Sequence, residues 1–276
     1  MRVALFLPCF NDTLFPETGV ATVRVLRELG VEVAFPQDQT CCGQIHFNTG
    51  YRREAVFLMK RFLSVFGHAE AIVAPSASCV AMVREQYREL AGWAGENALV
   101  EGVEEMAAKT HELTEFLVGR LGVEDVGASF HETVTFHPTC HSIRSIDVGD
   151  RPLRLLRAVR GLELVPLAGA EECCGFGGTF ALKNPDTSLA MMEDKIRNVL
   201  DSGARVLTAV DNSCLMHLAG GLKRRGLLPA GGQRARPGVH GGGNTAFHGE
   251  SHNAAPGIRL LHLAEILASR DERPGT

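Results

Sequence analysis

The stretch QTCCGQIHFNTGY, residues 39–51, sets two adjacent cysteines directly before a glycine. The stretch EECCGFGGTFALK, residues 171–183, repeats this arrangement. A single cysteine precedes each CCG, by 31 intervening residues in the first case and 32 in the second. One more cysteine follows each CCG, after 35 and 38 residues. The matched spacing predicts an internal repeat of about 130 residues, so that the chain consists of two similar halves.

Apolar runs and amphipathic stretches alternate in the same order within both halves. In the first half, the pattern predicts a strand, a helix, a strand, a helix and a strand at 3–9, 19–30, 31–36, 53–67 and 71–79. The second half repeats these elements at 133–140, 152–161, 162–169, 188–203 and 204–214. This alternation is typical of α/β folds with mainly parallel sheets. We therefore predict two pseudo-repeated α/β halves.

In each half, the cysteines come just after three of the predicted strands. The carboxyl ends of parallel strands meet at one edge of a sheet, and ligands of open α/β folds bind there. Cysteines that are far apart in the sequence are therefore expected to converge on one site per half.

Turn residues at 123–132 indicate a boundary, so we divide the chain into cysteine-rich halves at 1–125 and 126–276. Just before the boundary, helices are expected at 94–112 and 112–122. Residues 229–257 are rich in glycine and poor in large apolar side chains, which predicts a disordered insert. The chain is then expected to close with an amphipathic segment at 258–268.

The composition narrows the class of protein. The chain has 276 residues, of which 45% are hydrophobic, enough for substantial cores. Its formal net charge is −4 and it has no basic cluster, which argues against a nucleic-acid partner. No apolar run approaches the roughly 20 residues of a membrane span, and the N-terminal run is too short for a secretory signal. We therefore predict a cytoplasmic protein. The cytoplasm keeps thiols reduced.

The eight cysteines form two sets of four, which we take as the candidate ligands of a metal or cofactor. The first set is Cys9, Cys41, Cys42 and Cys79, and the second is Cys140, Cys173, Cys174 and Cys214. Four thiolates match a 4Fe-4S cluster, and soft sulfur ligands also suit zinc. Adjacent cysteines differ from the spaced pairs of zinc knuckles, and they can serve one centre only where the backbone bends sharply. The glycine of each CCG permits that bend.

We predict two iron-sulfur clusters, of the 4Fe-4S type, with one bound by each set. Three other interpretations stay open at this point. These are zinc in place of iron in one or both sets, buried structural cysteines, and a redox-active pair of thiols. A disulfide between adjacent cysteines is strained, and structural cysteines have no reason to repeat their spacing.

The arrangement resembles the cysteine-rich CCG domain family, whose pattern is a cysteine, a CCG and a C-x-x-C, commonly present twice. The stretches that carry the resemblance are CCGQIHFNTGY, PSASCVAMV, CCGFGGTFALK and DNSCLMHLAGGLKRRG, and they are most similar to members that serve lactate utilisation. The resemblance implies an oxidoreductase subunit: an iron-sulfur electron-transfer subunit of a complex that oxidises L-lactate to pyruvate with two other subunits. The alternatives are a subunit of a glycolate or other 2-hydroxy-acid oxidase or of a heterodisulfide reductase-like complex and, from another class, a zinc-stabilised assembly module without a redox role.

One feature departs from the family pattern. Ser76 and Asp211 stand where the first cysteine of each C-x-x-C belongs. This favours an ordinary cubane cluster, or one iron bound by a hydroxyl or carboxylate, and it argues against disulfide reduction. Four histidines lie near the cysteines and have groups able to donate to a cluster sulfur, but we expect structural or solvent-facing roles for them: His46, His137, His141 and His217.

Overall fold

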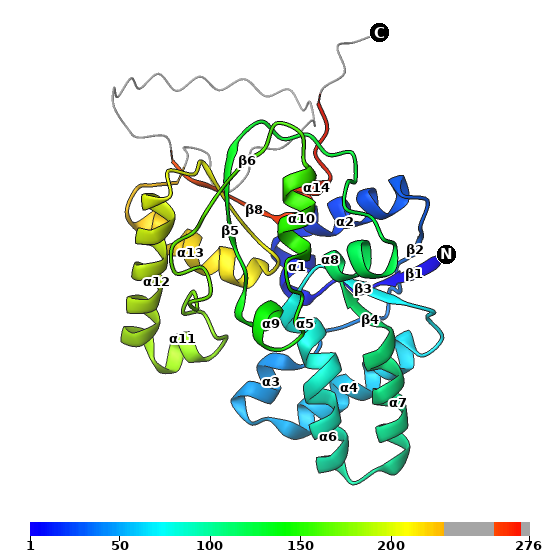
Figure 1. Ribbon diagram of the computed structural model, residues 1–276. Coiled ribbons are helices and arrows are strands. Elements are labelled where there is room, and N and C mark those ends of the chain that lie inside the picture. The colour runs from blue at the N-terminus through cyan, green and yellow to red at the C-terminus, as the bar shows by residue number, and fades with distance from the viewer. Residues whose placement is uncertain (229–256, 272–276) are drawn as a thin grey trace, which may run out of the picture.

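The computed structural model describes residues 1–228 and 257–271. Its strands form two four-stranded parallel sheets with matching orders, β2-β1-β3-β4 and β6-β5-β7-β8 (Figure 1). The matching orders confirm the predicted architecture of two repeated α/β halves. The strands are β1 Arg2–Leu5, β2 Glu32–Ala34, β3 Ile72–Ala74 and β4 Thr110–Glu112 in the first sheet, and β5 Thr133–His137, β6 Glu163–Val165, β7 Val206–Ala209 and β8 Arg259–His262 in the second.

Helices connect the strands in both halves. In the first half they are α1 Cys9–Leu14, α2 Pro16–Glu28, α3 Gln44–Thr49, α4 Arg52–Phe66, α5 Ala77–Ala81, α6 Tyr87–Ala94, α7 Asn97–Lys109 and α8 Leu113–Glu115. The second half has α9 Cys140–Arg144, α10 Arg151–Ala158, α11 Phe180–Lys183, α12 Pro185–Asp201, α13 Asn212–Arg224 and α14 Leu263–Leu267. Two short π-helical segments, η1 Met82–Gln86 and η2 Phe116–Arg120, extend α5 and α8.

The outer strands β4 and β8 correct the sequence expectation. Residues 94–112 were expected to be helical throughout, but the helix ends at Lys109 and 110–112 pair with β3. Likewise, the expected closing amphipathic segment begins as strand β8, paired with β7, before it turns into α14. The other strands are also short, but they lie in apolar runs, whereas β4 (THE) and β8 (RLLH) lie within stretches with a helical pattern, so pairing with the neighbouring strand decides their conformation.

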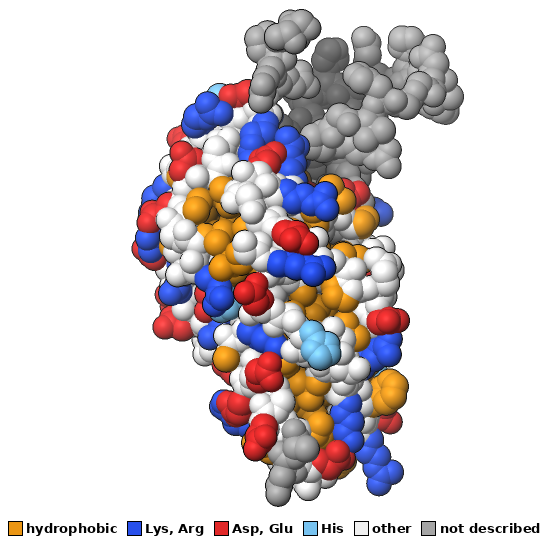
Figure 2. Space-filling view, turned by 90° about the vertical axis from the view of Figure 1, so that its right-hand side faces the viewer, with side chains coloured by type: hydrophobic (Ala, Val, Ile, Leu, Met, Phe, Trp, Pro, Cys, Tyr) orange, Lys and Arg blue, Asp and Glu red, His pale blue; other side chains and the backbone are white. Residues whose placement is uncertain are grey.

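The apolar pattern explains why the central strands are buried. Strand β3 lies between β1 and β4, and all three of its side chains are fully buried. Helix α2 covers the same sheet with an apolar face that includes Val25 and Leu26. Helix α12 lies along the outside of the second half in Figure 1, and it buries one apolar face that includes Met192 and Ile196. Figure 2 shows acidic and basic side chains interspersed with hydrophobic ones on one face of the molecule.

The last helix of each half packs against the other half. Helix α14, at the end of the second half, packs on α2 of the first half, and α8 of the first half packs on α10 of the second (Figure 1). A single core of buried residues accordingly includes Val25 and Phe116 together with Leu155 and Leu263. The halves are therefore repeated in structure but joined in their packing. The division at residues 125/126 stays a prediction.

The expected disordered insert at 229–257 lies outside the described residues, apart from its last residue. Within the part of the chain that the structure describes, no helix is both long and apolar enough to cross a lipid bilayer.

Candidate metal centre

All eight cysteines line one cavity of about 120 Å³ between the two halves. The first cysteine of each set begins the helix after the first strand of its half, and the last lies at the start of the helix after β3 or β7. Each CCG lies in the loop that follows β2 or β6. The sequence predicts one site per half at the carboxyl edge of each sheet. The tertiary structure adds that both edges face the same cavity.

In the first set, the thiols lie in two contacting pairs. The Cys9 Sγ is 3.6 Å from the Cys41 Sγ, and the Cys42 Sγ is 3.2 Å from the Cys79 Sγ. The bend at Gly43, with a φ of 87°, turns the adjacent cysteines toward one site. The Gly43 N–H then donates to the Cys41 Sγ at 3.4 Å. The predicted role of the CCG glycine is thus confirmed for this turn.

The second set repeats this pairing. The thiol of Cys140 interacts with that of Cys173, and the thiol of Cys174 with that of Cys214. Gly175 has a φ of 90°, and its N–H donates to the Cys173 Sγ at 3.3 Å. A Cβ at this glycine would lie 2.4 Å from the Ser188 carbonyl oxygen, so close backbone packing also demands glycine here.

The hydrogen bonds divide the thiols of each set into proton donors and acceptors. Hydrogen bonds from the Cys42 and Cys9 thiols lower the pKa of Cys41, and those from Cys140 and Cys174 do the same for Cys173. The same bonds, together with burial, raise the pKa of Cys42 and Cys174. Because thiolates are the metal-binding form, metal binding by these sets must release the protons that the donors hold.

The donor set fits a metal centre. All eight cysteines are free thiols. Two sulfurs on one tetrahedral metal with bonds of about 2.3 Å lie about 3.8 Å apart, close to the separations found here. Four convergent thiols suit both a cubane iron-sulfur cluster and zinc. The paired thiols of the first set therefore lie near the spacing of two ligands on one metal ion. The four cysteines of a cubane each bind a different iron, so a cubane would require these thiols to move further apart.

Comparison with known proteins identifies the family of this chain. Residues 3–84 and 134–219 each match the model of the CCG cysteine-rich domain. The chain belongs to the cysteine-rich CCG domain family. The resemblance predicted from the sequence is thereby confirmed, and the two matches contain the two cysteine sets.

Three relatives in this CCG family are named lactate utilization protein A. The protein from Geobacillus kaustophilus (strain HTA426) is 41% identical over 274 residues, which cover 98% of this chain and 100% of the relative. The one from Exiguobacterium sp. (strain ATCC BAA-1283 / AT1b) is 47% identical over 82% of this chain and 91% of its own length. The one from Geobacillus thermodenitrificans (strain NG80-2) is 44% identical over 98% and 100%.

The positions that depart from the CCG family pattern form a hydrogen-bond network between the halves. Asp211 is only 2% exposed, and its Oδ1 accepts from the Ser76 Oγ at 2.7 Å. The same oxygen accepts from the Ser78 N–H at 3.1 Å and the Ser78 Oγ at 2.9 Å. Its Oδ2 accepts from the Thr139 Oγ1 at 2.6 Å. Three hydrogen bonds to Oδ1 and one to Oδ2 hold this carboxylate, and those from Ser76 and Ser78 join the second half to the first.

The neighbouring Asn212 extends this network. Its Nδ2 donates to the Asn11 Oδ1 at 3.1 Å and to the Thr18 Oγ1 at 2.8 Å. Thr18 in turn donates to the Glu265 Oε1 at 3.0 Å. The chain of hydrogen bonds thus runs from the cysteine cavity to α14, the helix that packs on α2.

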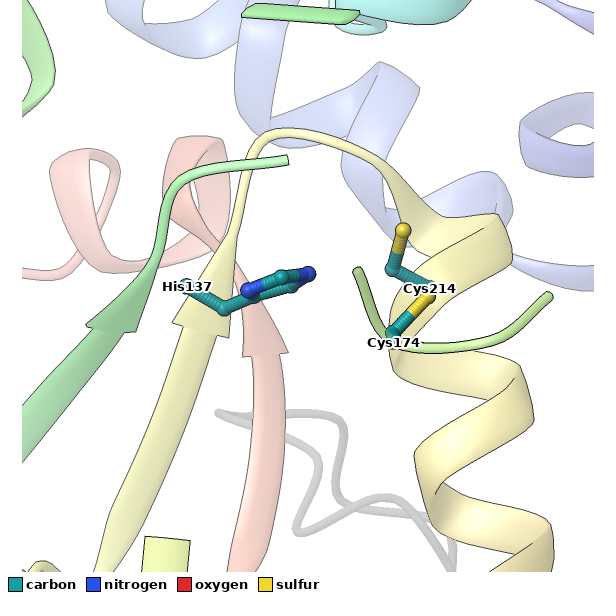
Figure 3. A group of neighbouring side chains, drawn as sticks. All are labelled: His137, Cys174 and Cys214. Atoms are coloured by element: carbon teal, nitrogen blue, oxygen red, sulfur yellow. The ribbon is translucent and has the colours of Figure 1, made fainter. Parts of the chain in front are cut away.

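His137 does not face solvent, and the structural role expected for it stays a prediction. Its side chain is fully buried, and neither ring nitrogen has a hydrogen-bond partner among the described residues. The Ala170 carbonyl lies near the ring without a hydrogen bond of normal geometry. A ring nitrogen and the sulfurs of Cys174 and Cys214 all lie within 4.8 Å of one another, and Figure 3 shows the ring directed toward these cysteines.

The other three histidines differ from His137. The His141 Nε2 lies 3.3 Å from the Gln44 Nε2, a contact between the halves. The His217 Nε2 lies 3.4 Å from the Ser188 Oγ. His46 is partly exposed, although its Nδ1 is buried without a partner.

Lys195 is a residue near the site that sequence reasoning missed. It is 1% exposed, and its ammonium donates to the carbonyl oxygens of Gly169 and Ala170. In the sequence it stands in an amphipathic helix, where a lysine normally indicates the solvent face. No signal in the sequence marks it as buried.

Proposed function

We propose that the protein is the iron-sulfur electron-transfer subunit of a complex that oxidises L-lactate to pyruvate. The observation that carries this proposal is the convergence of two Cys₄ sets on one cavity. Lactate as the substrate is supported by the similarity, over most of the chain, to relatives named for lactate utilisation. The proposed ligands are Cys9, Cys41, Cys42 and Cys79 for one 4Fe-4S cluster and Cys140, Cys173, Cys174 and Cys214 for the other.

Two centres of this kind suit the chemistry of the substrate. Oxidation of lactate to pyruvate releases two electrons and two protons. Iron-sulfur clusters supply one-electron transfer, so two sets offer a place for each electron. The protein contributes the thiolate ligands and the N–H donors of Gly43 and Gly175, which stabilise negative charge on the sulfurs.

We also propose that the protein works in the cytoplasm with other subunits of the complex. All eight cysteines are free, which agrees with a compartment that keeps thiols reduced. The sequence contains no flavin motif, so the site that first takes electrons from lactate belongs to a partner in this proposal.

The first experiment measures which metal the protein binds and how much of it. The full chain is produced with ample iron, purified without oxygen, and analysed for iron, sulfide and zinc. We expect a brown protein with about four iron and four sulfide per cysteine set. Stoichiometric zinc with negligible iron would instead support the zinc-stabilised assembly module and end the redox proposal.

The second experiment determines which compound reduces the clusters. The iron-loaded protein is combined with the subunits that co-purify with it, and reduction of the clusters is followed by electron paramagnetic resonance. We expect L-lactate to reduce the clusters and glycolate to leave them oxidised. Reduction by glycolate and not by lactate would make the protein a subunit of a different 2-hydroxy-acid oxidase, and reduction of a disulfide substrate would favour a heterodisulfide reductase-like complex.

A further inference from the structure

The two cysteine sets have different surroundings. His137 stands three residues before Cys140, and the residue three before Cys9 is Phe6. Phe6 directly follows β1 and His137 ends the equivalent strand β5, and both side chains are fully buried. The second set therefore has an imidazole with two unpartnered nitrogens where the first set has a hydrocarbon ring.

A second pair of equivalent positions shows the same contrast. Gly175 packs on Ser188 of α12, as Gly43 packs on Ala55 of α4. Seven residues further along these helices stand Lys195 in the second half and Phe62 in the first.

In the first half, Phe6 and Phe62 form an edge-to-face aromatic pair with ring centroids 5.0 Å apart. In the second half, the positions of that pair hold His137 and the buried ammonium of Lys195. An apolar pair in one half is thus replaced by two polar, cation-forming residues in the other.

Resting on the iron-sulfur function above, we propose that the second cysteine set holds the cluster of higher reduction potential. The His137 ring donates a hydrogen bond to the sulfur of Cys174 or Cys214 or to the cluster that they bind, and Lys195 supplies a positive charge beside it. The second set is then the site where an electron shared between the two clusters resides.

The physical reason is the charge that reduction adds. A reduced cluster is more negative by one electron, so hydrogen-bond donors and nearby cations stabilise it relative to the oxidised form. A buried environment weakens solvent screening, which strengthens the effect of Lys195. Glu172 also interacts with Lys195, but its side chain is exposed and its charge is screened by water. The Phe6–Phe62 pair provides neither a donor nor a charge to the first set.

The test compares midpoint potentials in the full-length, iron-loaded protein by a redox titration followed by electron paramagnetic resonance. The variants are His137→Phe and Lys195→Met, and the matched control is Phe62→Met at the position equivalent to Lys195. We expect each second-half variant to lower the higher of the two midpoint potentials by at least 59 mV, a tenfold change in a one-electron equilibrium constant. The lower potential is expected to stay unchanged, and the control to leave the higher potential unmoved.

Iron and sulfide content are measured on every sample. If His137→Phe loses its cluster, Lys195→Met still decides the outcome, because it removes no candidate ligand. Two clusters whose higher potential moves in neither variant, or a shift confined to the lower potential, would overturn this inference and leave the iron-sulfur function standing. Protein that contains zinc and no iron would overturn both.

Discussion

Replacing the Asp211 carboxylate tests how the two halves are joined. Asp211→Ala removes the acceptor for the hydroxyls of Ser76, Ser78 and Thr139 and for the Ser78 N–H. A hydrogen bond to a charged group contributes about 1.5–3 kcal/mol, and a buried donor left unpaired costs about 1–3 kcal/mol. These contributions do not add in full, since Asp211 and both serines line the cavity, where water can enter and bond the freed hydroxyls. We therefore expect the free energy of unfolding to fall by about 3–5 kcal/mol.

The assay is anaerobic thermal unfolding of the iron-loaded protein, with iron content measured for each variant. For a chain of this size the expected loss corresponds to a fall in Tm on the order of 10 °C. A double-mutant cycle of Ser76→Ala with Asp211→Ala isolates the bond between the halves, and we expect a coupling free energy of about 1–2 kcal/mol.

Ser188→Ala supplies the matched control. Ser188 is buried and donates to the Gly175 carbonyl within the second half, and it makes no hydrogen bond to Asp211. Its effect should add to that of Asp211→Ala within about 0.5 kcal/mol. If the coupling free energy between Ser76→Ala and Asp211→Ala were also below about 0.5 kcal/mol, the hydrogen bonds of Asp211 would not hold the two halves together.

Three further predictions concern the CCG turns and a buried carboxyl. Cys42→Ser and Cys174→Ser should each lower iron and sulfide only in the half that is changed, because three thiolates leave one iron without a sulfur ligand. Gly175→Ala should cost more stability than Gly43→Ala, in which a new Cβ lies 3.4 Å from the nearest atom, against 2.4 Å at Gly175; both pay about 1–2 kcal/mol for a left-handed backbone. Burial raises the pKa of the Glu112 carboxyl to about 7. The contribution of the neutral carboxyl to stability is therefore full below pH ~4.5 and is lost as pH rises to ~7. Over that range the free energy of unfolding of the wild type should fall by about 3 kcal/mol relative to that of Glu112→Gln.

Each of these predictions has a contradicting result. Full iron and sulfide with unchanged spectra in both serine variants would show that the second cysteine of each CCG is not a ligand. Equal Tm values for the two alanine variants would show that the backbone contact at Gly175 relaxes freely. A stability difference between wild type and Glu112→Gln that stays constant from pH 4.5 to 7 would mean that the Glu112 carboxyl does not titrate in that window.

The sequence by itself determined the repeat, the α/β class and the positions of the cysteines after strands. These features are local: a buried strand is a short apolar run, an amphipathic helix has its own period, and a CCG turn needs glycine at positive φ. The spacing of the cysteines then required only that parallel strands meet at one sheet edge. For this reason the main strands, their helices and the bends at Gly43 and Gly175 could all be predicted.

Only the tertiary structure decided what depends on the contact between the halves. Strands β4 and β8 lie within stretches that have a helical pattern in the sequence, and they are strands because β3 and β7 pair with them. The two cysteine sets face one cavity because the helices that carry them pack across the halves, α5 on α9 and α1 on α13.

The polar residues around the cavity follow the same rule. Asp211 reads in the sequence as a missing cysteine, and Lys195 as a solvent-facing charge in an amphipathic helix. Their burial and their partners come from chain segments distant in sequence, which no local pattern encodes. A sequence pattern reports how a segment meets its own neighbours, whereas the environment of a buried charge is set by every segment that folds against it.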